Sequence, residues 1–176
     1  MRDASDEQLM SEYVKGSMAA FELLYARHRG GLYRYFMRLS GHPATANDLY
    51  QGCWEKVIRA REQYTPDAPF RAWLFRIARN HHVDHLRAQR PASELDPELV
   101  DPDTVDSAEQ LDRGQRDGRL RAALAALPEE QRDALVLKLD AGLDLKTIAE
   151  VTGVGTETAK SRLRYATRSL KEALQT

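Results

Sequence analysis

The chain has 176 residues, of which 30% are charged, and a net charge of −1 at pH 7, so it can form one large domain or two small ones. It has no apolar run long enough to span a bilayer, and its N-terminus is polar and acidic rather than a signal peptide. The sequence therefore predicts a cytoplasmic protein that does not insert in a membrane. Cys53 is the only cysteine, which excludes an intramolecular disulfide, and its apolar neighbours favour a core position over a redox role.

The near-neutral net charge hides an uneven distribution of charge along the chain. Residues 1–90 carry 14 Lys/Arg against 10 Asp/Glu, and residues 119–176 carry 10 against 8. The residues between them, 91–118, carry 2 against 9 and include three prolines. The sequence therefore predicts two basic lobes joined by an acidic, flexible linker.

The first lobe begins with two predicted helices. Ser5 and Gln8 have the spacing of a capping box, which predicts a short helix that begins at the next residue. Ser17 caps the second helix, in which Gly30-Gly31 marks a point of kinking or weakening. The predicted core stripe of this helix consists of Phe21, Leu24, Tyr25, Leu32, Tyr35, Phe36 and Leu39.

A third helix is predicted to begin at Thr45, which has an acidic capping partner at Asp48. Its predicted buried face consists of Ala46, Leu49, Cys53, Trp54 and Val57. Its predicted outer face consists of Asn47, Asp48, Gln51 and Glu55. A loop with two prolines follows at 63–69.

The fourth predicted helix, residues 70–89, has two different sides. One side is apolar and carries Phe70, Trp73, Leu74 and Ile77, which makes Trp73 a predicted core residue. The other side collects, within an arc of about 100°, Arg76, Arg79, Asn80, Arg87 and Arg90. Val83 falls among these arginines, which indicates a surface that lies against a partner. On this stretch alone, an ordinary arginine-rich surface helix is the alternative.

The second lobe is predicted to be helical throughout. The pattern indicates a short helix at 120–127, another that begins at Pro128, a third at 145–152 and a long one at 156–174. The predicted inward residues are Leu120, Leu124, Leu127, Leu135, Val136, Leu139, Ile148, Ala149, Ala159, Leu163, Ala166 and Leu170. The sequence contains no useful run with the period of a strand, so the predicted fold is all-α, with two small helical domains joined by the acidic linker.

The strongest local motif is the pair of helices at 145–152 and 156–174, separated by the short turn Gly153-Val154-Gly155. This spacing predicts a helix-turn-helix, in which the second helix enters the major groove of DNA and the first crosses the backbone. Side chains that can bind phosphates and base edges gather in the first half of the second helix. They are Thr156, Thr158, Lys160, Ser161, Arg162 and Arg164. An αα-hairpin with a solvated basic face is the alternative.

Three segments together resemble the extracytoplasmic-function sigma factors, the minimal two-domain class of bacterial sigma factors. The segments are ANDLYQGCWEKV at 46–57, PFRAWLFRIARNHHVDHLR at 69–87 and GVGTETAKSRLRYA at 153–166. The resemblance implies an alternative sigma factor that binds core RNA polymerase and directs promoter recognition and melting. It implies no enzymatic activity and no cofactor.

The resemblance also implies roles for the residues of the first lobe. Residues 1–90 would form sigma region 2, in which Asp48 and Gln51 bind the clamp-helix coiled coil of RNA polymerase. The helix at 70–89 would melt and read the −10 element, partly as unpaired bases. Its contact residues would be Arg76, Arg79, Asn80, Asp84 and Arg87.

For the rest of the chain, the resemblance implies a linker at 91–118 that runs toward the RNA exit path, and sigma region 4 at 119–176, which reads the duplex −35 element. An anti-sigma factor is a further partner that the family allows. The chain departs from the usual family pattern at Asn47, where glutamate is usual, and at Gly52, where an acidic or larger residue is usual. It departs again in the recognition helix at Glu157, Ala159 and Tyr165, so no −35 sequence preference is implied.

A histidine cluster, His81, His82 and His85, is the remaining candidate for chemistry. No cysteine or carboxylate pattern completes a metal site, so these side chains are predicted to be packed or partner-facing. Two other functional classes remain open. A stand-alone helix-turn-helix regulator with an N-terminal sensor or dimerisation domain would be a dimer that binds duplex tightly without polymerase. An enzyme built on the histidines has no nucleophile, glycine-rich phosphate loop or metal spacing to support it.

Overall fold

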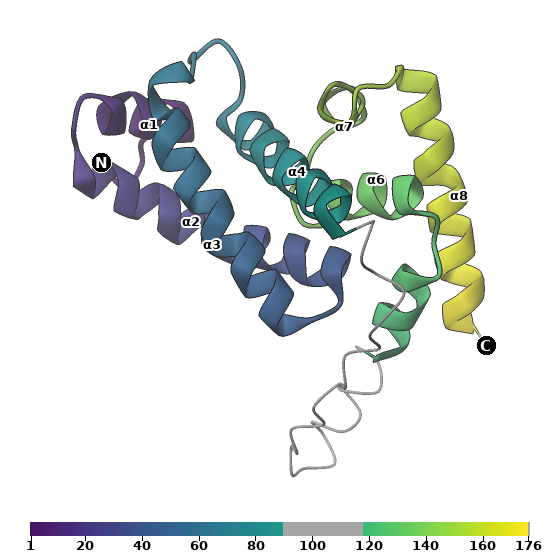
Figure 1. Ribbon diagram of the computed structural model, residues 1–176. Helices are drawn as coiled ribbons and strands as arrows, with labels where there is room; N and C mark the ends of the chain where they lie inside the picture. Colours follow the sequence, from purple (N-terminus) through teal and green to yellow (C-terminus); the bar gives the residue numbers. More distant parts are fainter. Residues whose placement is uncertain (90–117, 176) are drawn as a thin grey trace.

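The computed structural model describes residues 1–89 and 118–175, and every regular element in these two ranges is helical (Figure 1). The first range contains α1 (Asp6–Val14), α2 (Met18–Ser40), α3 (Pro43–Ala60), a 3-10 turn (Arg61–Gln63) and α4 (Phe70–Gln89). The second contains a helical segment at 118–125, α6 (Glu129–Leu139), α7 (Leu145–Thr152) and α8 (Thr156–Gln175). The all-α prediction is confirmed. The predicted linker, apart from Gly118, and the predicted face residue Arg90 lie outside the described residues.

No helix in the described ranges is long and apolar enough to cross a membrane.

Local sequence signals set the ends of the first helices as predicted. The capping box at α1 is complete: the Gln8 N–H donates to the Ser5 Oγ at 3.2 Å, and the Ser5 N–H donates to the Gln8 Oε1 at 2.8 Å. The Ser17 Oγ caps α2 by accepting from the Ala20 N–H. Gly41 ends α2 with a left-handed φ of 74°, which suits glycine.

Helix α3 begins at Pro43, two residues before the predicted start at Thr45. His42 is the N-cap residue, and Pro43 occupies the first turn, where its missing N–H costs no helical hydrogen bond. The predicted faces of this helix are confirmed. The buried residues are Ala46, Leu49, Cys53, Trp54 and Val57, and the exposed residues are Asn47, Asp48, Gln51 and Glu55.

Helix α4 lies in the middle of the molecule, with α2 and α3 on one side and α6 and α7 on the other (Figure 1). Its buried side chains are Phe70, Leu74, Phe75, Ala78 and His82. The predicted apolar face omits Phe75 and His82. Its members Trp73 and Ile77 are partly buried and pack against the core. The reason is that α4 is covered from two directions, so its buried surface is wider and rotated relative to a single apolar stripe.

The start of α4 is held by α1. The Glu7 Oε1 accepts from the Phe70 N–H at 2.9 Å, so a carboxylate from another helix caps the N-terminus of α4. The Phe70 ring packs against His28 with a centroid distance of 5.2 Å, and the His28 Nε2 lies 2.8 Å from the Asp6 Oδ2. The hydrogen bond from His28 lowers the pKa of Asp6. Helix α1 therefore fixes the point at which the basic helix begins.

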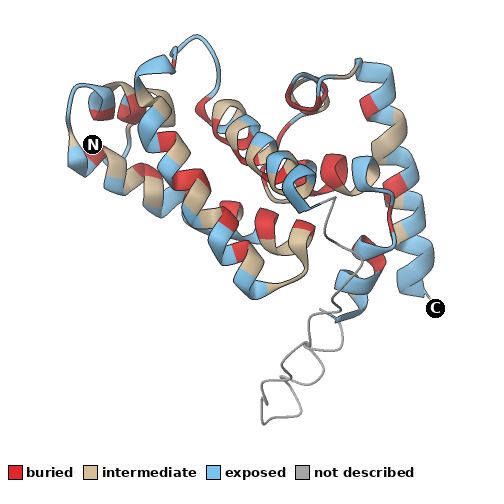
Figure 2. Ribbon diagram, in the orientation of Figure 1, coloured by how far each residue is buried: buried red, intermediate tan, exposed pale blue. Residues whose placement is uncertain are grey.

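Helix α6 is buried on most of its circumference, although its sequence predicts one apolar face. The buried residues are consecutive: Asp133, Ala134, Leu135, Val136 and Leu137. Leu139, a predicted core residue, is instead 52% exposed. A helix without a polar side is covered from several directions. Helix α6 packs against α8 and also against α2 of the first lobe. Figure 2 shows the buried residues on this helix.

The two lobes share one apolar core. Buried side chains of α2 and α4 belong to the same cluster as those of α6 and α7, so that Tyr35 and Leu137 are in one core. Helix α2 continues unbroken through Gly30 and Gly31. A Cβ on Gly31 would lie 3.1 Å from the backbone oxygen of Asp140. The glycine therefore allows α2 to approach the end of α6, which explains its place in a helix.

Candidate nucleic-acid interface

Four of the five side chains predicted to contact the −10 element lie on the exposed side of α4. They are Arg76, Asn80, Asp84 and Arg87. The Asp84 Oδ2 is 3.8 Å from the Lys56 Nζ of α3, an exposed pair that contributes little to stability. The result is a basic helix face with an amide in it, which can attract a phosphate backbone and form hydrogen bonds with a base edge.

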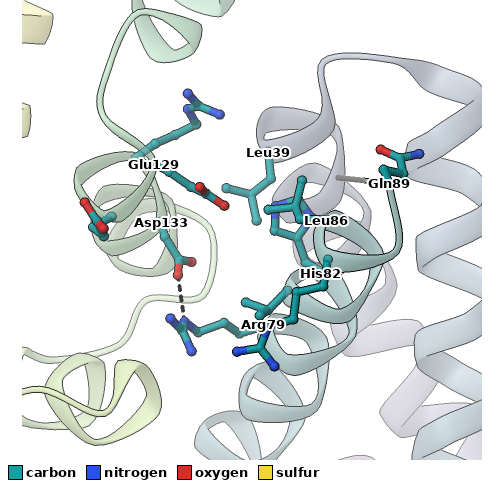
Figure 3. Close-up of a pocket in the computed structure, with 11 residues that line it drawn as sticks. Leu39, Arg79, His82, Leu86, Gln89, Glu129 and Asp133 are labelled. Atoms are coloured by element: carbon teal, nitrogen blue, oxygen red, sulfur yellow. Dashed lines mark hydrogen bonds and ion pairs between the residues drawn. The ribbon is translucent and has the colours of Figure 1, made fainter. Parts of the chain in front are cut away.

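Arg79, the fifth predicted residue, contacts the second lobe. Its Nε donates to the Oδ2 of Asp133 on α6 at 2.7 Å (Figure 3). The Tyr35 hydroxyl donates to the Oδ1 of the same carboxylate at 3.1 Å. Burial raises the pKa of Asp133, while the charge and hydrogen bond of Arg79 act against that rise. The sequence gives no signal for this contact, because Asp133 is 54 residues away and in the other lobe.

A pocket of about 520 Å³ lies between the lobes beside this ion pair. Figure 3 shows Arg79 and His82 of α4 on one side of it, with Glu129 and Asp133 of α6 facing them. Val83 also lines the pocket, which explains why an apolar residue lies among the arginines of α4. The partner surface that Val83 indicates is therefore, in this structure, the second lobe of the same chain.

His82 is buried at 7% exposure, and within the described ranges its Nδ1 has no hydrogen-bond partner. Burial, followed by the neighbouring charges of His85 and Arg132, lowers the pKa of His82 from 6.5 to about 4. The imidazole is therefore neutral in the folded protein near pH 7. Sequence spacing places His82 in a cluster with His81, but it cannot show that the two rings have different surroundings.

We expect His82→Leu to raise thermal stability more at pH 5 than at pH 7.5. In the wild type, the unfolded chain takes up a proton at His82 below about pH 6.5, whereas the folded chain does so only near pH 4. The stability that this group contributes is therefore present above pH 6.5 and is lost as the pH falls, by roughly 2 kcal/mol at pH 5. Thermal unfolding of both proteins at both pH values measures the difference. His85→Leu on the same helix is the control, and an equal gain at both pH values would contradict a neutral, buried His82.

The predicted helix-turn-helix is present in the C-terminal lobe. The Asp144 Oδ1 caps α7 by accepting from the Thr147 N–H at 2.8 Å. Hydrogen bonds from the side chain of Thr147 and from its backbone N–H lower the pKa of Asp144. Gly153 ends α7 with a left-handed φ of 72°, and α8 begins three residues later at Thr156. The predicted contact residues that are exposed on α8 are Thr156, Thr158, Lys160 and Arg164, and those that are half-buried are Ser161 and Arg162.

We expect Lys160→Ala to weaken binding to duplex DNA equally for all −35 sequences. It should also reduce the slope of the logarithm of the binding constant against the logarithm of salt concentration by about one unit. The physical reason is that Lys160 is an exposed cation on the recognition helix, suited to a phosphate. Arg162→Ala should change the slope less, because Arg162 is half-buried and close enough to Asp133 to lower its pKa. Fluorescence anisotropy at several salt concentrations checks both, with Lys15→Ala, at the exposed residue just after α1, as the control. An unchanged slope for Lys160→Ala would mean that it makes no phosphate contact.

The predicted polymerase contacts Asp48 and Gln51 lie about one turn apart on the exposed side of α3. Beside them, a Cβ on Gly52 would lie 2.6 Å from the Nε2 of His81 on α4. The His81 ring also packs edge-on against Phe36, with a centroid distance of 6.4 Å. The absence of a side chain at Gly52 therefore makes room for His81.

His81, His82 and Cys53 lie among packed side chains of the helices. In the ranges that the structure describes, no group of three or more His, Cys, Asp or Glu side chains is placed to hold a metal ion. His81 and His82 pack against neighbouring helices, as the sequence predicts for a packed surface. Cys53 is fully buried, and burial raises its pKa to about 12, which confirms the predicted core position.

Two sequence families match the chain: Sigma-70 region 2 over residues 24–92 and Sigma-70, region 4 over residues 117–170. The chain is 35% identical to the ECF RNA polymerase sigma factor SigL of Mycobacterium tuberculosis over 179 residues, which cover 92% of this chain and 95% of SigL. The two matched regions contain the two polar helix faces described above, on α4 and on α8.

Two solved structures have a similar fold. CnrH in complex with the cytosolic domain of CnrY has a TM-score of 0.74 and 24% identity, covering 98% of both chains. The sigma factor RpoE in complex with the anti-sigma factor NepR, from Bartonella quintana, has a TM-score of 0.72 and 24% identity, covering 89% of this chain and 97% of RpoE. With the helical fold, both sigma regions and the similarity to SigL established, the chain belongs to the extracytoplasmic-function RNA polymerase sigma factors, which are alternative sigma factors for transcription initiation.

Proposed function

We propose that this sigma factor binds core RNA polymerase and brings it to promoters by contacting two DNA elements, without covalent chemistry of its own. Residues 1–90 bind polymerase and the melted −10 element, and residues 119–176 bind the duplex −35 element. Residues 91–118 connect the two. The proposed place of action is the cytoplasm, where transcription occurs in bacteria.

One observation carries the proposal: the same chain presents two exposed, polar helix faces with different chemistry. The recognition helix α8 follows a complete helix-turn-helix turn, which suits the major groove of duplex DNA. The face of α4 instead combines the cations Arg76 and Arg87 with the short amide of Asn80. A positive face with a hydrogen-bonding group suits a separated strand, whose backbone is attracted by charge and whose bases are accessible.

An anti-sigma factor is also among the proposed partners. The support is that the fold neighbour RpoE is described in complex with the anti-sigma factor NepR. Addition of core polymerase to the purified chain, followed by gel filtration, tests the main proposal against a stand-alone regulator. The proposed sigma factor elutes with polymerase, whereas a regulator elutes as a dimer and binds duplex DNA tightly by itself.

We expect Asp48→Arg to abolish binding to core polymerase in a pull-down. Asp48 and Gln51 are both exposed on one side of α3, where a partner helix can reach both, and reversal of the charge turns attraction into repulsion. Circular dichroism should show that the lobe remains folded, because Asp48 has no buried contact to lose. Glu22→Arg, an equal change of charge at an exposed position of α2, is the matched control. Wild-type affinity of the Asp48 variant would reject this site.

A further inference from the structure

The first turn of α8 carries an acidic residue, Glu157, on a helix whose other charged residues are mostly Lys and Arg. We propose that Glu157 determines sequence specificity: its carboxylate accepts a hydrogen bond from the amino group of a cytosine in the −35 element, so that the chain prefers a C·G pair at that position. The inference rests on the proposed function, because it takes α8 as the helix that enters the major groove of the −35 duplex.

The first argument is the position of Glu157 on the helix. Helix α8 lies along one edge of the molecule (Figure 1), and the side that packs on α6 and α7 carries Ala159, Leu163 and Ala166. Glu157 is exposed and lies about 150° round the helix from the middle of that side. In a helix-turn-helix, the N-terminal residues of the second helix are the ones that contact base edges. Glu157 therefore faces the bases when α8 is in the groove.

The second argument is the set of side chains beside Glu157. Arg164 follows it by seven residues, so the two are nearly in line, about 10 Å apart along the helix axis. The Arg164 guanidinium lies 5.3 Å from the centroid of the Tyr165 ring, a cation–π contact that restricts its position. Lys160 and Ser161, about one turn from Glu157, lie on its two flanks. Glu157 is therefore the charged residue of the first turn, ahead of the cations that suit the phosphate backbone.

The third argument is the chemistry of the major groove. A carboxylate among phosphates is repelled, so Glu157 lowers the affinity for DNA unless it accepts a hydrogen bond there. Two base groups in the groove can donate one: the N4 amino group of cytosine and the N6 amino group of adenine. The adenine amino group lies beside the acceptor N7, which repels a carboxylate, whereas cytosine itself presents no acceptor in this groove. The carboxylate of Glu157 therefore selects cytosine.

A structural role for Glu157 makes a different prediction. In the described ranges, no ion pair or side-chain hydrogen bond engages the Glu157 carboxylate, which lies near the positive end of the α8 dipole. That interaction stabilises the helix equally whatever DNA is bound, so it produces no base preference. A base preference that changes when Glu157 is replaced therefore distinguishes base reading from helix stabilisation.

The preference can be measured with the full chain assembled with core polymerase. Duplexes in which the −35 segment is randomised are selected for binding and sequenced, and anisotropy then compares the best duplex with its single-base variants. We expect the wild type to favour cytosine at one position by about tenfold. Glu157→Ala should lose the preference at that position alone, and should bind duplexes with other bases there more tightly. Glu157→Gln should favour adenine there, because a glutamine amide pairs with N6 and N7 of adenine.

Glu172→Ala is the matched control, because it removes the same charge from an exposed position of the same helix. Glu172 lies about 22 Å from Glu157 along the axis, whereas the major groove is only about 12 Å wide. The control should therefore leave every base preference unchanged. Loss of the cytosine preference by Glu172→Ala as well would assign the effect to net charge and reject base reading by Glu157.

The remaining outcomes separate this inference from the proposed function. Lys160→Ala tests α8 as a DNA-binding helix, because loss of a phosphate contact weakens binding to every duplex in the library. If Lys160→Ala has this effect but Glu157→Ala alters all affinities equally or none, the role of Glu157 is rejected and the function of α8 stands. A cytosine preference that persists in Glu157→Gln also rejects it. A change from cytosine to adenine in Glu157→Gln supports it.

Discussion

Asn80→Ala is expected to lower transcription from a duplex promoter by roughly 5- to 150-fold, which corresponds to about 1–3 kcal/mol of lost base reading. Asn80 is exposed in the middle of the basic face of α4, between Arg76 and Arg87. Its amide has both a donor and an acceptor, which suits a base edge, and it carries no charge for long-range attraction. The loss should therefore be specific to the step at which the base is read.

Comparison of duplex and pre-melted templates tests this assignment. On a promoter with a −10 bubble, Arg76→Ala and Arg87→Ala should recover in part, because binding energy no longer has to drive strand separation. Asn80→Ala should remain poor, because the unpaired base still has to be recognised. Arg79→Ala is a less suitable comparison, since it also breaks the contact with Asp133. Transcription at two salt concentrations completes the test, because only the arginine effects should depend strongly on salt.

Equal rescue of Asn80→Ala and Arg76→Ala by the bubble would show that Asn80 does not read a base. Wild-type activity of all these variants on both templates would show that α4 takes no part in promoter recognition. Binding of the variants to core polymerase is the control, because α4 and the proposed polymerase contact on α3 are on different helices.

Phe75→Ala is expected to reduce the free energy of unfolding by about 3–5 kcal/mol, the usual cost of removing a buried phenyl ring. Phe75 is 2% exposed and packs edge-on against Tyr35 with a centroid distance of 5.4 Å. For a chain of this size, such a loss lowers the melting temperature by roughly 10 °C. The substitution should also weaken the contact between the lobes, because the Tyr35 hydroxyl donates a hydrogen bond to Asp133.

Phe75→Leu is the matched control, since it keeps an apolar side chain and should cost less than half as much. Thermal unfolding followed by circular dichroism compares the two variants with wild type. A destabilisation by Phe75→Ala below about 1 kcal/mol would mean that the ring is not part of the core.

The elements of this fold that could be predicted from the sequence are those whose structure depends only on residues within the same helix. The capping box at Ser5, the buried face of α3 and the bounds of α7 need only local spacing, and the structure confirms them. The start of α3 is different, because Pro43 and Thr45 are both acceptable near a helix N-terminus. The proline fits the first turn, so the helix begins there.

The differences between the predicted and the observed buried faces of α4 and α6 have one common cause. Periodicity predicts a single buried stripe, but α4 and α6 are each covered by both lobes. Phe75 and Asp133 are therefore buried, and Leu139 is not, in ways that depend on how the lobes pack. The candidate site shows the same limit: the exposed positions of Asn80 and Lys160 follow from helix geometry, whereas the partner of Arg79 follows only from tertiary structure.

The hydrogen bond by which Glu7 caps α4 affects where a chimera of two sigma factors can be joined. The match to region 2 begins at residue 24, inside α2, and leaves α1 out. A chimera joined at that boundary would separate the carboxylate of Glu7 from the Phe70 N–H, and His28 from its partner Asp6. The exchangeable unit of this protein is therefore larger than the matched region 24–92: if α4, the helix proposed to read the promoter, is transplanted into another sigma factor, α1 should be transplanted with it.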